Sequence, residues 1–211
     1  MSEIDDKVSI IIPYIRKEGM ERCKDAIFKN SGVPKEQFEI LTSFDGDRIG
    51  APLMVKFLVD VAKHDLVMFL GDDTVPQPDF LSNALQVMAK IPDGWGLVGL
   101  NDGVQNGLYL ATHWLGHKKL LSLIDGEFFH TGYYHCFCDN ELTQRATALG
   151  RYLWSTDAKI KHLNPMVTPG VETDEDYKRV YSLEWFFHDQ VLFWKRKRNN
   201  WKNPNNKNQG E

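Results

Sequence analysis

The fold of this chain is indicated first by the stretch Asp65-Leu66-Val67-Met68-Phe69-Leu70-Gly71-Asp72-Asp73-Thr74. In it, an apolar run of strand length ends in two adjacent carboxylates, and a turn region with Pro76 and Pro78 follows. Ligands of open α/β sheets collect beyond the carboxyl ends of the strands, where Mg²⁺ or Mn²⁺ can bind carboxylates together with phosphate oxygens of a substrate. Paired aspartates after a strand are also common in solvated turns, so the rest of the chain must decide between the two interpretations.

Strands and helices are expected to alternate around this stretch. Strands are predicted at residues 8–12, 38–41, 66–70 and 96–100, with Pro13 ending the first. Between them, apolar residues recur at helical spacing in three groups: Met20, Cys23 and Ile27; Met54, Phe57, Leu58 and Val61; and Leu81, Ala84, Leu85 and Met88. This alternation predicts an α/β fold, a single Rossmann-like domain whose mostly parallel central sheet is flanked by helices. Asp45 and the pair Asp72-Asp73 would then lie at the same edge of the sheet.

The pattern is looser after residue 100. Glycine, aromatic and histidine residues are interleaved at 109–137, which predicts an irregular region. A helix is expected where Leu142, Ala146 and Leu149 recur before Gly150, and a strand is expected at 151–162. Residues from about 195 onward are rich in Asn, Lys and Arg, and we expect them to be disordered.

The composition predicts one cytoplasmic, globular domain. The chain has 211 residues, 42% of them hydrophobic, and its formal charge of −4 excludes a general attraction to nucleic acid or anionic membrane. Residues 195–211 contain six of the 25 basic residues but one of the 29 acidic residues, so an acidic body carries a basic tail. No apolar stretch reaches the roughly 20 residues that span a bilayer, and the N-terminus is polar and acidic. The odd cysteine count predicts reduced thiols.

Four motifs follow one another in a characteristic order, and a histidine, His162, comes after the last of them. The motifs are Val8-Ser9-Ile10-Ile11-Ile12-Pro13-Tyr14 with Arg16, Asp45-Gly46, Phe69-Leu70-Gly71-Asp72-Asp73 with Pro78-Asp79-Phe80-Leu81, and Asp139-Asn140-Glu141-Leu142 with Arg145 and Gly150. Over roughly residues 7–165 they resemble the family 2 glycosyltransferases of the GT-A fold. The resemblance implies an inverting enzyme that moves one sugar from a nucleotide diphosphate sugar, most readily a UDP-sugar, to a hydroxyl of a saccharide or other glycoconjugate, with Mn²⁺ or Mg²⁺ as cofactor.

The resemblance also implies roles for individual residues. Asp73 and His162 are expected to hold the metal, and Asp139 to act as the catalytic base, with Glu141 as the fallback. The donor nucleotide is expected to contact Pro13, Tyr14, Arg16, Asp45 and Asp72, and the sugar or acceptor to contact Asp102 and His135. The metal would neutralise the departing diphosphate, and a base is needed because the acceptor hydroxyl has a pKa far above 7.

On the same basis the chain divides into four parts. Residues 1–194 form the transferase domain, with a nucleotide-sugar-binding half at 1–100, an acceptor and catalytic half at 101–165 and a helical extension at 166–194. The basic tail occupies 195–211. The Gln-x-x-Arg-Trp motif and the membrane helices of processive members are absent from the sequence, which predicts a single transfer per encounter.

Three positions depart from the family pattern. Gly71 occupies the first acidic position of the Asp-x-Asp motif, and Phe44 replaces the first acid of the Asp-Asp-Gly-Ser turn. Cys138 stands where the base motif usually has a glutamate. Because of Gly71 and Phe44, a catalytically inactive nucleotide-binding module of the same fold is kept as an alternative.

Other features leave further alternatives open. Residues of zinc-ligand type cluster without a common spacing pattern at His130, His135, Cys136 and Cys138. The tail interleaves aromatic and basic residues, so a transferase acting on a hydroxylated base in DNA is also an alternative. A nucleotidyltransferase would need a Gly-rich loop where residues 13–16 stand. Trp185 and Trp194 either mark an interface or cover the sheet.

Overall fold

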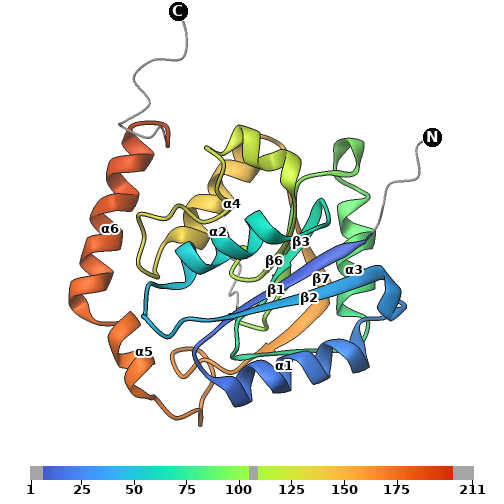
Figure 1. Cartoon of the computed structure of the whole chain (residues 1–211). Helices are drawn as coiled ribbons and strands as arrows, with labels where there is room; N and C mark the ends of the chain where they lie inside the picture. Colours follow the sequence, from blue (N-terminus) through green and yellow to red (C-terminus); the bar gives the residue numbers. More distant parts are fainter. Residues whose placement is uncertain (1–6, 105–108, 202–211) are drawn as a thin grey trace, which may run out of the picture.

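The computed structural model describes residues 7–104 and 109–201. The centre of the protein is a seven-stranded sheet with the strand order β2-β1-β3-β6-β5-β7-β4 (Figure 1). The strands are β1 (Val8–Tyr14), β2 (Phe38–Phe44), β3 (Leu66–Phe69), β4 (Thr74–Pro76), β5 (Leu97–Asn101), β6 (Trp114–His117) and β7 (Tyr152–His162). The α-helices are α1 (Lys17–Asn30), α2 (Ala51–Val61), α3 (Phe80–Met88), α4 (Cys138–Ala148), α5 (Glu175–Val180) and α6 (Leu183–Arg198). Short 3-10 helices lie at Lys35–Gln37, Pro92–Gly94 and Lys118–Leu123.

Five of the seven strands run in the same direction, so the sheet is mostly parallel, as predicted. β1 pairs in parallel with β2 and β3, and β5 pairs in parallel with β7. β6 lies antiparallel between β3 and β5, and β4 pairs antiparallel with the end of β7. The expectation of an irregular region at 109–137 is therefore wrong for Trp114–His117, a strand of four residues that is too short to show a periodicity.

Helices cover both faces of the sheet. Ile10 of β1 and Met68 of β3 belong to a core that α1 and α3 close on one face. Ile11 and Phe69, one residue further along each strand, belong to a second core that α2 and α4 close on the other face. Successive strand residues point to opposite faces, so burial of both faces explains the nearly continuous apolar runs.

Two predicted boundaries are wrong. β1 continues through Pro13 because β3 pairs with β1 only as far as Ile11, so the missing N–H of Pro13 interrupts no pairing with β3. Helix α6 continues to Arg198, so the tail predicted from residue 195 begins inside a helix, and its remainder at 202–211 lies outside the described residues.

Two further features concern the cysteines and the length of the helices. Cys23, Cys136 and Cys138 are all free thiols in the structure. No helix of the described ranges combines the length and the apolar character that crossing a membrane requires. The division of the chain into functional halves stays a prediction.

Candidate functional site

A cavity of about 430 Å³ opens at the carboxyl edge of the sheet. Its size is within the usual range for small-molecule sites. Most residues that the sequence analysis selected line it: Pro13, Tyr14, Arg16, Asp45, Asp72, Asp73, His135, Asp139 and His162. Asp102 and Glu141 are not in the lining. The cavity therefore gathers the predicted donor and metal residues in one place, together with the predicted base.

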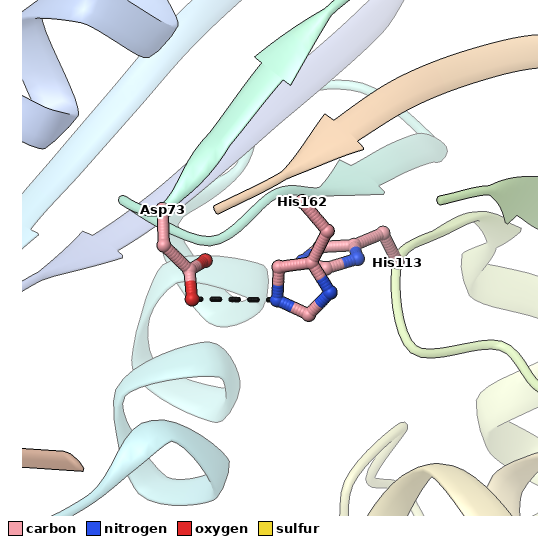
Figure 2. Close-up of side chains that lie close together, drawn as sticks. All are labelled: Asp73, His113 and His162. Carbon is pink, nitrogen blue, oxygen red and sulfur yellow. Dashed lines mark ion pairs between the residues drawn. The ribbon is translucent and has the colours of Figure 1, made fainter. Parts of the chain in front are cut away.

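Strand pairing brings three possible metal ligands together in this cavity. Asp73 precedes Thr74 of β4, which pairs with His162 at the end of β7. His113 precedes Trp114 of β6, which pairs with the last residue of β3. Figure 2 shows the three side chains converging, and ligand atoms of Asp73, His113 and His162 all lie within 4.8 Å of one another. His113 was not predicted from the sequence, because no sequence signal indicates the antiparallel strand β6.

The space around these side chains fits a cation. A Cβ atom at Gly71 would lie 2.6 Å from Oδ1 of Asp73 and 3.3 Å from Nε2 of His113. Glycine at this position therefore leaves room between the two ligand atoms. His113 is buried, and its Nδ1 has no hydrogen-bond partner among the described residues. One carboxylate and two imidazoles form a donor set suited to a divalent transition metal.

The three side chains differ in their protonation. Burial and the neighbouring charge of His162 lower the pKa of His113 to about 3, so this imidazole is neutral. Burial lowers the pKa of His162 too, but the carboxylates of Asp102 and Asp73 outweigh burial and raise it to about 9. Burial raises the pKa of Asp73, yet His162 and other nearby groups reverse this effect and hold it well below its usual range. Protonated His162 thus carries the positive charge beside Asp73 that a bound cation would otherwise supply.

Asp102 lies behind His162 instead of facing the cavity. Its Oδ2 is 3.6 Å from Nδ1 of His162, while Nε2 of His162 is 3.3 Å from Asp73. Asp102 also accepts hydrogen bonds from the backbone N–H of Val104 and the hydroxyl of Thr112. A carboxylate behind the ring is an arrangement that commonly orients histidine ligands of metals, and here the contact is an ion pair longer than a hydrogen bond. The expected contact between Asp102 and the sugar has no support in this position.

Two of the predicted nucleotide residues hold loops of the cavity wall. Oδ2 of Asp72 accepts the backbone N–H groups of Ile15 and Arg16, each at 2.8 Å, and Oδ1 accepts the Arg16 guanidinium at 3.1 Å. Asp45 accepts the backbone N–H groups of Ile49 and Gly50 at 2.8 and 3.0 Å. Both carboxylates therefore shape the loops after β1 and β2, and each also borders the cavity.

The two carboxylates considered as catalytic bases have different surroundings. Asp139 lies in the first turn of α4 and lines the cavity, and burial raises its pKa. Glu141 is 3% exposed, and Arg196 of α6 donates two hydrogen bonds to it, at 2.7 and 2.8 Å. The Tyr133 hydroxyl also donates to Glu141, at 2.7 Å. Glu141 therefore links α4 to α6 through a buried ion pair. Because it does not line the cavity, its position does not support the role of fallback base.

Helix α6 also holds the loop that precedes α4. The Asp189 carboxylate, 0% exposed, accepts the backbone N–H groups of Tyr134, His135 and Cys136 at 2.8–2.9 Å. All three residues line the cavity. A buried anion on the C-terminal helix thus shapes a wall that also includes Asp139, and no sequence motif pointed to it.

Helix α5 covers the cavity next to the candidate metal site. The Tyr177 hydroxyl donates a hydrogen bond to Oδ2 of Asp73 at 2.9 Å, and the Arg16 guanidinium lies 4.0 Å from the centre of the Tyr177 ring. Arg16 also donates two hydrogen bonds to Asp174, at 2.6 and 3.0 Å. Arg179 of α5 lines the cavity, and its buried Nε has no partner among the described residues.

The alternative zinc site does not form. His130 contacts Glu127 at 3.2 Å, and the Cys138 thiol donates to the carbonyl of His135. Within the described part of the chain, the Asp73, His113 and His162 group is the one set of residues close enough to share a metal ion.

Comparison with known proteins identifies the fold. No family model matches this chain, and a search of curated proteins gives no match. Among solved structures it is similar to the mannosyltransferase PcManGT from Pyrobaculum calidifontis in complex with GDP-Man and Mn²⁺, with a TM-score of 0.67 and 15% identity, over 94% of this chain and 66% of that chain. The chain has a GT-A-like glycosyltransferase fold.

A second similarity is to S. aureus TarS. The TM-score is 0.59 at 16% identity, over 90% of this chain and 43% of TarS. TarS 1-349 in complex with UDP-GlcNAc gives 0.58 at 16% identity, over 90% and 72% of the two chains. The chain thus spans about two thirds of the mannosyltransferase and less than half of TarS, and these neighbours bind nucleotide sugars.

Proposed function

We propose that this protein is an inverting, non-processive glycosyltransferase of family 2 that uses a nucleoside diphosphate sugar and a divalent metal. The observation that carries the proposal is the meeting of Asp73, His113 and His162 in the cavity that Asp139 also lines. The GT-A-like fold, shared with proteins solved with GDP-Man and UDP-GlcNAc, supports a donor of this class. Among nucleotide sugars, a UDP-sugar is the donor that we propose, as the family resemblance implies.

In the proposed reaction, each part of the cavity has one task. The loop after β1, held by Asp72, would bind the nucleotide together with Asp45 of the loop after β2. Arg179 would contact the diphosphate, because a buried guanidinium N–H without a partner is costly and a phosphate oxygen satisfies it. The metal, when bound, supplies positive charge that offsets the charge developing on the leaving diphosphate.

Asp139 would act on the acceptor. As the acceptor oxygen forms its bond to the anomeric carbon and the bond to the diphosphate breaks, Asp139 takes the hydroxyl proton. Its raised pKa, caused by burial, brings it closer to the neutral range in which a carboxylate base is most effective. A single displacement of this kind inverts the anomeric configuration.

The donor set favours Mn²⁺ over Mg²⁺. Two of the three side chains are imidazoles, whereas Mg²⁺ is bound through oxygen ligands and keeps several waters. The Mn²⁺ in the PcManGT complex supports the same choice.

Nucleotide-dependent thermal stabilisation tests the proposal. UDP, GDP, CDP and dTDP are compared with Mn²⁺, with Mg²⁺ and with EDTA, and release of nucleoside diphosphate from the matching sugar donor is then followed. A ligand at about 100 times its dissociation constant stabilises by roughly 2.7 kcal/mol, a shift of several degrees. We expect one diphosphate to stabilise only with metal, and His113→Ala to remove the effect. His130→Ala, outside the cavity, is the matched control.

Two structural observations bear on the alternatives. The hypothesis of an inactive nucleotide-binding module depended on Gly71 and Phe44. Gly71 leaves room between Asp73 and His113, so a glycine at this position is compatible with a metal site. The DNA alternative depended on the basic tail, in which Arg196 is 3% exposed and bound to Glu141 while Lys195, Lys197 and Arg198 are exposed, so it stays a prediction. Metal-dependent nucleotide binding without any release of diphosphate from a sugar donor would support the catalytically inactive nucleotide-binding module instead of a transferase.

A further inference from the structure

Helix α6 carries an exposed apolar stripe on its outer side. Leu183, Phe187, Val191 and Trp194 are 73%, 54%, 66% and 50% exposed. Their spacing of four, four and three residues places them along one face of the helix, over about 16 Å. Figure 1 shows α6 along one side of the molecule. A contiguous exposed apolar surface of this kind is typical of an interaction site.

The stripe has no role in packing α6 onto its own domain. The inner side of the helix makes those contacts through Asp189, Phe193 and Arg196, which are all nearly inaccessible to solvent. The inner side of α6 is therefore covered by its own domain, and the apolar stripe on the other side is left exposed, although an apolar face of a helix is normally buried.

Charges at the two ends of α6 indicate what covers the stripe. Glu184 lies in the first turn, and Lys195, Lys197 and Arg198 lie exposed in the last turn. Neither Glu184 nor Lys195 forms an ion pair with another described residue. A helix that is acidic at one end and basic at the other complements a second copy of itself in antiparallel orientation, whereas a parallel copy would place like charges together.

We propose that two copies of this chain associate through antiparallel α6 helices. A two-fold axis between Phe187 and Val191 places Phe187 against the partner's Val191 and Leu183 near the partner's Trp194. The same axis brings Glu184 toward the partner's Lys195. Such an interface is isologous, so each contact occurs twice. An anionic membrane fits less well, because the basic residues are confined to one end of the helix and the body of the protein is acidic.

The dimer is weak and reversible. Helix α6 has 16 residues and is about 24 Å long, and one such helix pair buries less than the roughly 800 Å² per partner of a standard stable interface. The dissociation constant is therefore expected in the micromolar range, on the order of 10–100 μM.

Sedimentation equilibrium of the full chain tests the proposal. The unaltered protein should show a concentration-dependent dimer, and Phe187→Asp should weaken association at least tenfold, because it places a charge at the centre of the stripe. Phe57→Asp is the matched control, since Phe57 is 55% exposed on α2. A protein that stays monomeric at about 500 μM, or one that loses the dimer with Phe57→Asp but not with Phe187→Asp, overturns the proposal.

Charge reversal tests the orientation of the helices. Glu184→Lys and Lys195→Glu should each weaken association about threefold to tenfold, because each leaves two like-charged contacts per dimer. The double variant restores the opposite charges across the axis and should recover association close to that of the unaltered protein. A double variant weaker than both single variants overturns the antiparallel arrangement. Circular dichroism checks that all variants fold.

Discussion

Nε2 of His162 lies 3.3 Å from Oδ2 of Asp73, although the two residues belong to distant parts of the sequence (Figure 2). The antiparallel pairing of β4 with β7 produces this contact. Together with Asp102, this contact raises the pKa of His162, so the proton on His162 competes with any cation that binds the two side chains.

We therefore predict that Mn²⁺ affinity rises with pH. His162 has a pKa of about 9, so it is protonated at pH 6 and must lose its proton to bind metal. His113, with a pKa of about 3, is neutral throughout this range. Between pH 6 and 9 the affinity should increase by up to about tenfold per pH unit and then level off. Titration calorimetry at pH 6.5, 7.5 and 8.5 measures this slope, and equal affinity at all three values would contradict the prediction.

Gly71→Ala should impair the same site without replacing any of the three metal-binding residues. The added Cβ lies 2.6 Å from Oδ1 of Asp73, so the carboxylate must move. We expect Mn²⁺ affinity to fall by at least about tenfold and the free energy of unfolding to fall by about 1–3 kcal/mol. Calorimetry and urea denaturation measure the two effects. Unchanged Mn²⁺ affinity would show that the metal does not need the space beside Gly71.

Asp139→Asn and Glu141→Gln should fail in different ways. Asp139→Asn removes the proposed base, so turnover should drop by about 10²–10⁴ while metal-dependent nucleotide binding persists. Glu141→Gln leaves the longer contact with Asp125, at 3.8 Å, as the remaining ion pair of the buried Arg196, and should cost about 3–5 kcal/mol of stability. Diphosphate release and urea denaturation separate the two variants. Full turnover in Asp139→Asn would require another base.

Asp189→Asn should loosen the cavity wall from a distance. Three backbone N–H groups would lose a charged acceptor, at an expected cost of about 2–4 kcal/mol in stability. Because these groups belong to cavity-lining residues, nucleotide-dependent stabilisation should weaken as well. Gln190→Ala, at the next position of α6, is the control and should change neither quantity by more than about 0.5 kcal/mol. Normal nucleotide binding in a destabilised Asp189→Asn protein would limit Asp189 to a role in folding.

Local sequence was sufficient for most elements of the fold. The runs at β1 and β3 are apolar on both faces, and the three apolar groups at helical spacing belong to α1, α2 and α3. The carboxylates after β2 and β3 were predicted to share an edge, and Asp45, Asp72 and Asp73 do line one cavity. These features depend on the periodicity of short segments and on the parallel order of neighbouring strands, both of which a sequence displays.

Tertiary structure alone decided the membership of the site. His113 belongs to the site because β6 is inserted antiparallel beside β3. Asp102 lies behind His162 and does not line the cavity, and Glu141 forms an ion pair with Arg196. Asp189 shapes the wall from the C-terminal helix. Each of these contacts joins segments that are far apart in the chain. Their side chains have no periodic relation to one another, so the pairing of strands and helices in space, and the need to satisfy buried charges, determine which of them meet.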